Sequence, residues 1–290
     1  MTKDDQIVVP PLWRELRAAV EASTLLSSRE FRSPAPAADQ GLAVLLIPGV
    51  YAPDETLLPM ARWLKRMGYA PKRAGIRFNV DCSEAEMERL EARVQRAARS
   101  SGKRVAIVGW SRGGLFARAL AVRHPDLVGG IVTLGSPLQS PLLYVHPFLH
   151  LALEATSSLG DRGVPNLLTH KCADEWVLEG ANPSSKLSKL LLERARRLLG
   201  DRDEPRCCEP FWRDVRGQFP PGVRFVSLYS RTDGLVHWES CLDPAARHVE
   251  VDASHCGMGV SPRVYPVLAS ELGRIAAAER PAFPADALAA

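Results

Sequence analysis

The sequence predicts an α/β fold in which helices cover both faces of a mostly parallel β-sheet. Short apolar runs suited to buried strands alternate four times with helical stretches between positions 42 and 134. Two further strand-like runs follow near the C-terminal end, after a long stretch that predicts only helices. A chain of 290 residues can bury one full-sized core. We therefore expect a single domain over 1–290, with a helical cap inserted at 140–221.

Composition and charge exclude several classes of partner. Apolar residues make up 46% of the chain and charged residues 24%, as in ordinary water-soluble domains. The net charge of +4 is small for this length, so we expect no nucleic-acid partner. No apolar run reaches the length of a transmembrane helix, and residues 1–16 lack the apolar core of a secretory signal. We expect a cytoplasmic protein, with peripheral membrane contact left open.

Residues 11–26 place apolar side chains near helical spacing and predict a helix that packs on the core through that face. A proline- and alanine-rich linker at 32–41 follows this helix. The apolar face consists of Leu12, Leu16, Ala19, Val20 and Leu26.

The first predicted strand, 42–47, runs directly into Pro48, Gly49 and Val50. At the carboxyl edge of a parallel sheet, a glycine turn of this kind lets backbone N–H groups face a reacting atom. An ordinary turn between a strand and a helix explains these residues equally well. The next predicted elements are a helix at 53–68, a strand at 70–76 and an amphipathic helix at 83–100.

A sharp turn carrying a serine separates the next strand, 105–108, from a helix. Gly109, Ser111 and Gly113 form the pattern Gly-x-Ser-x-Gly at this turn. Side chains two residues on either side of the serine would collide, so glycines are needed there. The turn exposes the serine hydroxyl, and the helix that follows points its positive end at the site.

A buried strand at 127–134 completes the alternating part of the chain, and the predicted cap follows. Helices are predicted at 142–159 and 186–199, the second of them basic and amphipathic. Phe211 and Trp212 either line a pocket beneath this cap or pack in the core. Strands at 223–229 and 247–251, a helix at 262–278 and a loose C-terminal tail complete the chain.

Three residues that follow separate predicted strands form the pattern of a catalytic triad. A serine hydroxyl becomes a good nucleophile when a histidine takes its proton and an acid orients that histidine. Ser111 follows the strand at 105–108, Asp233 follows the next-to-last strand, and His255 follows the last strand. The chain order is serine, acid, histidine.

The chain resembles the α/β-hydrolase superfamily, and within it the lipase and esterase branch with a helical cap. The resemblance extends from 42 to 278 and is most specific in the segments IPGVYAPD, VGWSRGGLFAR, YSRTDGLVHWESC and DASHCGMGVSP. It implies Ser111 as nucleophile, His255 as base and Asp233 as acid. It also implies oxyanion-hole N–H groups from Arg112 and Val50. Many members have histidine where this chain has Pro48 before the glycine and Trp110 before the serine.

Other residues compete for two of these roles. Asp252 and Asp243 are alternatives for the acid, but Asp252 lies only three positions before His255, which is too close to reach around its ring easily. Of the seven histidines, six are placed in helices, a strand or the predicted cap: His124, His146, His150, His170, His237 and His248.

The six cysteines predict mostly reduced thiols rather than a metal site. They lack paired CxxC spacing, so we expect no zinc and no cofactor. Cys241 and Cys256 lie beside the two triad loops, where a disulfide would stiffen the site, although two buried thiols are favoured in a reducing compartment. The remaining cysteines are Cys82, Cys172, Cys207 and Cys208.

We expect an enzyme that cleaves carboxylic esters of small molecules or lipids through an acyl-enzyme. An acyltransferase or a thioesterase would use the same intermediate. A binding protein that keeps the fold without turnover is a third alternative, against which the complete set of Ser111, Asp233 and His255 argues.

Overall fold

The computed structural model describes residues 9–37, 41–139, 145–172 and 207–278. Its centre is a six-stranded sheet in the order β2-β1-β3-β4-β5-β6, in which every neighbouring pair of strands is parallel. The prediction of a mostly parallel sheet flanked by helices is confirmed. The strands are β1 (Ala43–Ile47), β2 (Ala70–Arg73), β3 (Val105–Trp110), β4 (Val128–Leu134), β5 (Arg224–Tyr229) and β6 (Arg247–Glu250).

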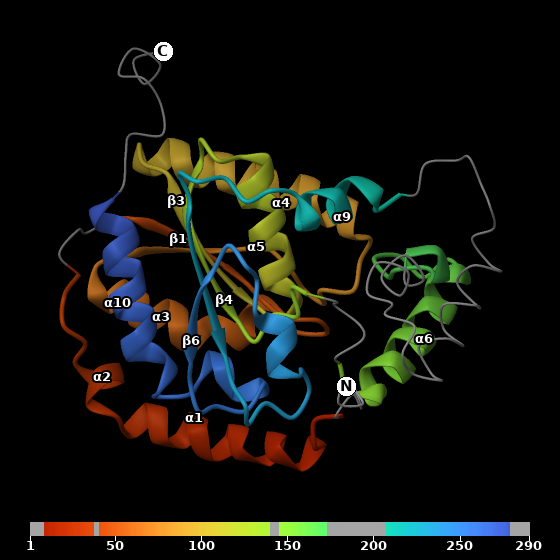
Figure 1. Cartoon of the computed structure of the whole chain (residues 1–290), viewed down its shortest axis with the longest axis horizontal. Coiled ribbons are helices and arrows are strands. Elements are labelled where there is room, and N and C mark those ends of the chain that lie inside the picture. Colours follow the sequence, from red (N-terminus) through yellow and green to blue (C-terminus); the bar gives the residue numbers. More distant parts are fainter. Residues whose placement is uncertain (1–8, 38–40, 140–144, 173–206, 279–290) are drawn as a thin grey trace, which may run out of the picture.

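Helices cover both faces of this sheet (Figure 1). Each described helix for which the sequence predicts a range lies close to that range. Gly68 ends the helix α3 (Leu58–Met67) in the left-handed conformation, with φ of 96°, as is common for a glycine that follows a helix. The α-helices are α1 (Arg17–Ser27), α2 (Arg29–Arg32), α3 (Leu58–Met67), α4 (Ser83–Ser101), α5 (Arg112–Arg123), α6 (Pro147–Asp161), α9 (Glu209–Arg216) and α10 (Val264–Ala277). Within the described ranges, the short 3-10 helices are η1 (Leu12–Leu16), η2 (Asp54–Leu57), η3 (Trp238–Cys241) and η4 (Cys256–Gly259).

Alternate residues of the four inner strands β1, β3, β4 and β5 enter two separate hydrophobic cores. Leu45 and Ile107 face the core beneath α4, α5 and α9, whereas Val44 and Val108 face the core beneath α3 and α10. Burial on both faces is what the continuous apolar runs of parallel strands predict. The sheet is therefore a rigid support whose strand ends hold the loops that follow them.

The strand order changes direction at β1, which lies between β2 and β3. The chain adds β2 on one side of β1, and it adds β3, β4, β5 and β6 in turn on the other side. The loops that follow β1 and β3 therefore diverge from one another at the carboxyl edge of the sheet. Ligands of open α/β sheets bind in the crevice at such a switch point. The loop at 48–50 and the turn at Ser111 both lie there.

The N-terminal helix packs through a different face from the predicted one. Leu16 is 79% exposed and Val20 is 65% exposed, whereas Glu21 and Leu25 are buried. The apolar spacing at 11–26 therefore predicted the helix but not its buried side. Leu12 and Leu26, from the same predicted face, are exposed as well.

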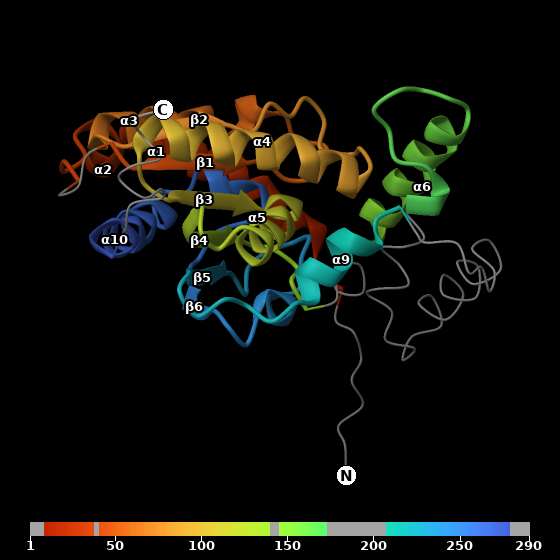
Figure 2. The same ribbon diagram turned by 90° about the horizontal axis from the view of Figure 1, so that it is seen from above.

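Only the two ends of the predicted cap lie among the described residues. α6 stands beside the sheet in both views, whereas α9 packs against α5 (Figures 1 and 2). Phe211 and Trp212 are buried, and the Phe211 ring lies 5.1 Å from that of Phe116, so both residues pack in the core. The basic helix predicted at 186–199 and the C-terminal tail lie outside the described residues. Within the part of the chain described, no helix is both long and apolar enough to cross a membrane.

Candidate active site

Ser111 lies on the strained turn that the glycine pattern predicts. Its φ of 54° and ψ of −121° are backbone angles that residues other than glycine rarely adopt, because the conformation is strained. Such strained residues cluster at functional sites. A Cβ on Gly109 would lie 2.4 Å from the Gly113 carbonyl oxygen, and a Cβ on Gly113 would lie 2.2 Å from that of Ile47. Gly109 is therefore required for β3 and α5 to approach this closely, and Gly113 is required for the close approach of α5 to the end of β1.

His255 and Asp233 form a buried pair. Nδ1 of His255 lies 2.7 Å from Oδ2 of Asp233, and the two side chains are 5% and 2% exposed. The other carboxylate oxygen of Asp233 accepts hydrogen bonds from the backbone N–H groups of Leu235 and Val236, at 2.8 and 2.7 Å. The aspartate is thus fixed by its own loop, and it presents one oxygen to the imidazole.

The end of β4 brings the serine turn and the histidine together. The Ser111 backbone N–H donates to the Leu134 carbonyl at 2.9 Å. The next residue, Gly135, is so close to the pair that a Cβ there would lie 3.2 Å from both His255 Nδ1 and Asp233 Oδ2. The serine turn and the His255–Asp233 pair therefore both lie against the end of β4, at the carboxyl edge of the sheet.

Trp110 joins the serine turn to the histidine loop. Its indole N–H donates to the His255 carbonyl at 3.0 Å, and the two ring centroids are 6.0 Å apart. Trp110 therefore has a structural role, although members of the superfamily that this chain resembles usually have histidine at this position. The indole restrains the backbone that carries the imidazole.

The glycine loop after β1 lies against the serine. A Cβ on Gly49 would be 3.1 Å from the Cβ of Ser111, so the backbone of this loop lies directly against Ser111. Val50 follows in the loop, and Arg112 is the first residue of α5. Asn79 holds the loop from behind, because its side-chain amide donates to the Pro48 carbonyl at 2.6 Å.

The side chain of Arg112 is buried and fastens the same region. Its guanidinium donates to the Asn79 side-chain oxygen at 2.7 Å, to the Asp81 carbonyl at 2.8 Å and to the Ser83 hydroxyl at 3.0 Å. Burial lowers the pKa of Arg112 to about 10, which leaves it charged at neutral pH. Arg112 therefore ties the serine turn to the segment that supports the glycine loop.

The N-terminal segment clamps both loops of the histidine–aspartate pair through polar contacts that the sequence did not predict. The Glu15 carboxylate accepts from the backbone N–H groups of Gly234, His255 and Cys256, at 2.8, 3.0 and 2.7 Å. Glu21 accepts from the Ser254 N–H and hydroxyl, at 3.0 and 2.6 Å. These bonds explain why the carboxylates of Glu15 in η1 and Glu21 in α1 lie on the packed side of the N-terminal segment.

The local charges favour the protonated form of His255. Burial alone would lower its pKa, but the charge and hydrogen bond of Asp233, together with the charge of Glu15, outweigh it, so the pKa is raised above 6.5. An imidazole held in this way binds a proton readily and keeps its orientation.

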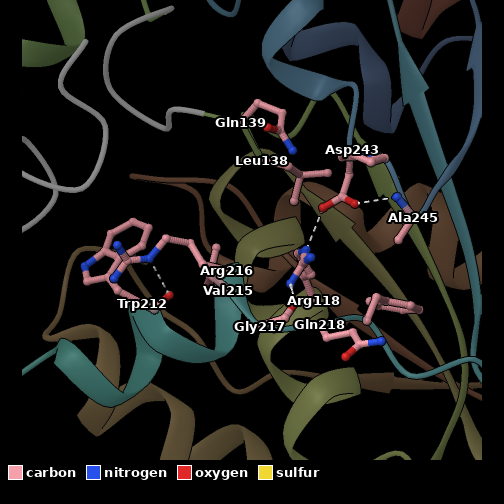
Figure 3. A pocket seen from close by; sticks show the side chains of 12 residues that line it. Arg118, Leu138, Gln139, Trp212, Val215, Arg216, Gly217, Gln218, Asp243 and Ala245 are labelled. Carbon is pink, nitrogen blue, oxygen red and sulfur yellow. Dashed lines mark hydrogen bonds and ion pairs between the residues drawn. The ribbon is translucent and has the colours of Figure 1, made fainter. Parts of the chain in front are cut away.

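The two alternative acids lie elsewhere. Asp252 is exposed and pairs with Arg17 at 2.8 Å and with Arg263. Asp243 is buried with Arg118, whose Nε lies 2.6 Å from Oδ2, and it lines a cavity of about 410 Å³ between α5, α9 and the loop before β6 (Figure 3). Neither Asp233 nor His255 lines that cavity.

The rival histidines with described side chains also have other partners. His248 bonds to the Asp243 carbonyl, His146 caps α6, and His170 lies between Glu154 and Asp161. Cys241 and Cys256 form no disulfide with one another. Cys256 is exposed, which corrects the prediction of two buried thiols.

Comparison with known proteins agrees with this architecture. The family model of the alpha/beta hydrolase fold matches residues 70–161, which include α4, β3, the serine turn, α5 and β4. The protein has the α/β-hydrolase fold. No curated protein sequence matches the chain.

Several solved structures have a similar fold at low sequence identity. A soluble variant of monoglyceride lipase from Saccharomyces cerevisiae, in complex with a substrate analog, is 13% identical, with a TM-score of 0.51 over 83% of this chain and 89% of that chain. Mature Bacillus licheniformis lipase BlEst2 is 14% identical, with a TM-score of 0.48 over 82% of this chain and 94% of that chain. A monoacylglycerol lipase from Paleococcus ferrophilus is 14% identical, with a TM-score of 0.48 over 83% and 98%. The yeast structure supports the α/β-hydrolase fold and nothing finer.

Proposed function

We propose that the protein is a serine hydrolase that cleaves carboxylic esters through an acyl-enzyme. The single observation that carries this proposal is the buried His255–Asp233 pair beside the strained turn of Ser111. The α/β-hydrolase fold and the likeness to a yeast monoglyceride lipase favour an ester of a small molecule or a lipid.

In the proposed reaction, the Ser111 hydroxyl attacks the ester carbonyl while His255 accepts its proton. Asp233 binds Nδ1–H of the imidazole, which leaves Nε2 as the base. The N–H groups of Arg112 and Val50 are proposed to stabilise the oxyanion, with the positive end of α5. His255 then gives the proton to the departing alcohol, and water releases the acyl group by the same steps.

Hydrolysis of nitrophenyl esters of rising acyl-chain length tests this proposal. The wild type should release nitrophenol, and Ser111→Ala should lower kcat by at least about 10³-fold because the nucleophile is lost. The control is Ser100→Ala, an exposed serine in α4 whose hydroxyl only bonds its own helix. Equal turnover by wild type and Ser111→Ala would exclude Ser111 as the nucleophile.

Competing acceptors separate hydrolysis from acyl transfer. With added alcohols or thiols, a hydrolase should still release mainly free acid, whereas an acyltransferase should form the new ester or thioester. A matched series of thioesters and oxygen esters identifies a thioesterase, because its kcat/KM should be higher for the thioesters than for the oxygen esters.

The raised pKa of His255 gives the reaction an expected pH dependence. The base must be neutral, so kcat/KM should rise with pH through a midpoint above 6.5. Glu15→Gln removes a negative charge that raises this pKa, and the midpoint should therefore move to lower pH.

The control for this change is Glu250→Gln, which removes an exposed carboxylate from the edge strand. Its pH profile should match that of the wild type within error. A midpoint that stays in place or rises in Glu15→Gln would show that Glu15 does not act on the imidazole in the way proposed.

A further inference from the structure

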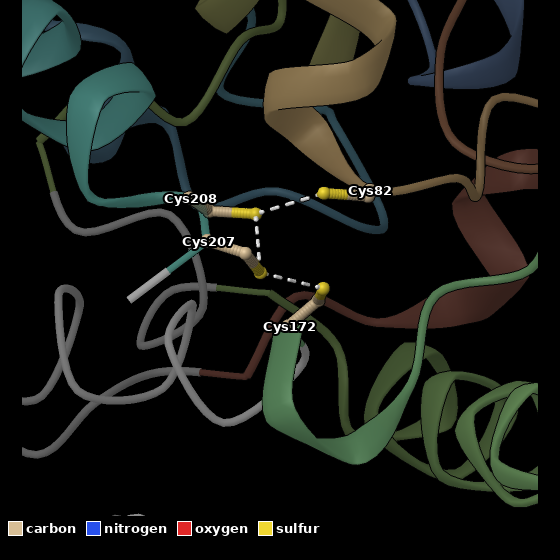
Figure 4. Close-up of side chains that lie close together, drawn as sticks. All are labelled: Cys82, Cys172, Cys207 and Cys208. Atoms are coloured by element: carbon tan, nitrogen blue, oxygen red, sulfur yellow. Dashed lines mark hydrogen bonds between the residues drawn. The ribbon is translucent and has the colours of Figure 1, made fainter. Parts of the chain in front are cut away.

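Four cysteines from three separate segments converge at one place outside the candidate active site (Figure 4). All four sulfur atoms lie within 4.8 Å of one another. The shortest separations are 3.2 Å between Cys172 and Cys207, 3.5 Å between Cys82 and Cys208, and 3.7 Å between Cys207 and Cys208. The sequence predicted no metal site because CxxC pairs are missing, and the fold assembles this cluster without them.

The supporting segments are held together by contacts besides the thiols. Cys82 immediately precedes α4, and Cys208 immediately precedes α9. Cys172 lies beyond α6, where the Leu168 N–H donates to the Val80 carbonyl at 2.7 Å, only two residues before Cys82. The four thiols are therefore brought together by defined backbone packing.

The separations fit four sulfurs around one ion better than they fit two disulfides. A disulfide needs an S–S distance of about 2.05 Å, well below every separation found here. Four sulfurs placed tetrahedrally around zinc at about 2.3 Å lie roughly 3.8 Å apart. The separations of 3.2, 3.5 and 3.7 Å are close to that value. Each sulfur also belongs to one group of four rather than to an isolated pair.

We propose that Cys82, Cys172, Cys207 and Cys208 bind one Zn²⁺ ion as a structural site with four thiolate ligands. A tetrahedral set of four thiolates selects zinc among common divalent ions, and four protein ligands leave no open position for a reacting water. The ion fastens the segment after α6 and the start of α9 to the start of α4.

Positive charge near the cluster favours a thiolate site. Four thiolates and one Zn²⁺ ion carry a net charge of −2, which needs compensation in a partly buried place. The buried Arg112 guanidinium holds both residues that flank Cys82, through the Asp81 carbonyl and the Ser83 hydroxyl. Cys82 and Cys208 also stand at the N-termini of α4 and α9, where the helix dipole contributes partial positive charge.

This placement connects the zinc site to the supports of the glycine loop. Arg112 bonds both the Cys82 segment and Asn79, and Asn79 bonds the Pro48 carbonyl. Removal of the ion should therefore loosen the packing between α4, α9 and the segment that carries Cys172. Metal content tests the proposal without reference to ester hydrolysis, so it stands or fails independently of the proposed function.

The test measures metal in the full chain, purified under reducing conditions without an affinity tag that binds metal. Elemental mass spectrometry should find one zinc ion per chain, and the chelator-treated protein should take up one equivalent again. Substitution with Co²⁺ should give the intense visible bands of a tetrahedral thiolate site. Cys208→Ser and Cys82→Ser should each lower zinc content and the melting temperature.

Cys241→Ala is the matched control, because it removes a buried thiol that lies outside the cluster. It should retain one zinc ion per chain. Wild-type protein that takes up no stoichiometric zinc and gives no thiolate band with Co²⁺ would overturn the proposal, as would native disulfides between these four cysteines. The wild-type measurements decide the question even if a serine variant fails to fold.

Discussion

Asp233→Asn should lower kcat of ester hydrolysis by about 10⁴-fold at neutral pH, with the fold intact. An asparagine keeps the oxygen that accepts from Leu235 and Val236, so the loop should hold its shape. Its amide N–H₂ would replace the oxygen that lies 2.7 Å from His255 Nδ1. That change selects the wrong imidazole tautomer and leaves the imidazolium uncompensated; the size of the effect is the one known for this substitution in a serine protease triad.

The matched control is Asp252→Asn, which changes the nearby acid that pairs with Arg17 and Arg263. Because Asp252 does not touch the imidazole, its kcat should stay within a few-fold of wild type. A decrease of less than tenfold in Asp233→Asn, measured on protein with a native melting temperature, would remove Asp233 from the proposed triad.

Gly113→Ala should destabilise the protein and lower kcat/KM together. The new Cβ would lie 2.2 Å from the Ile47 carbonyl oxygen and 2.8 Å from that of Pro48, which are backbone atoms that cannot simply rotate away. We expect a loss of about 1–3 kcal/mol or more in the free energy of unfolding, as for other overpacked positions. The displaced residues belong to the loop that carries Val50, so the oxyanion-hole geometry should suffer as well.

Gly273→Ala provides the control, because a Cβ there would meet nothing within 4 Å. This glycine lies within α10, so alanine should stabilise the chain by roughly 0.5–1 kcal/mol. Urea denaturation and ester hydrolysis measure both effects. Wild-type stability and activity in Gly113→Ala would show that α5 does not approach the end of β1 as closely as described.

The sequence predicted the sheet and the loops at its edge because their signals are local. Strands buried on both faces read as continuous apolar runs, and each candidate catalytic residue comes soon after such a run. The predicted strands and the helices flanking them are confirmed to within a few residues. The roles of Ser111, Asp233, His255, Val50 and Arg112 stay predictions, which the experiments above test.

The buried face of the N-terminal helix was predicted wrongly for a physical reason. Hydrophobic periodicity assumes that the packed side is apolar, but Glu15 and Glu21 are packed against backbone N–H groups of the loops that carry Asp233 and His255. A carboxylate that satisfies several N–H donors is stable when buried, and a helical pattern holds no record of those distant donors.

The cysteine cluster could not be predicted from spacing either. Its members come from the start of α4, the segment after α6 and the start of α9, and only the tertiary fold brings them together. Cys207 and Cys208 are neighbours in sequence, which is unlike the CxxC pairs from which zinc sites are usually recognised.

The central claim is that the hydroxyl of Ser111 is the nucleophile, activated by His255 and Asp233. The most direct measurement is labelling with a fluorophosphonate, followed by peptide mass spectrometry to locate the adduct. We expect one adduct per chain on Ser111, slower labelling in Asp233→Asn and none in Ser111→Ala. An adduct on another residue, or undiminished labelling of Ser111→Ala, would contradict the claim.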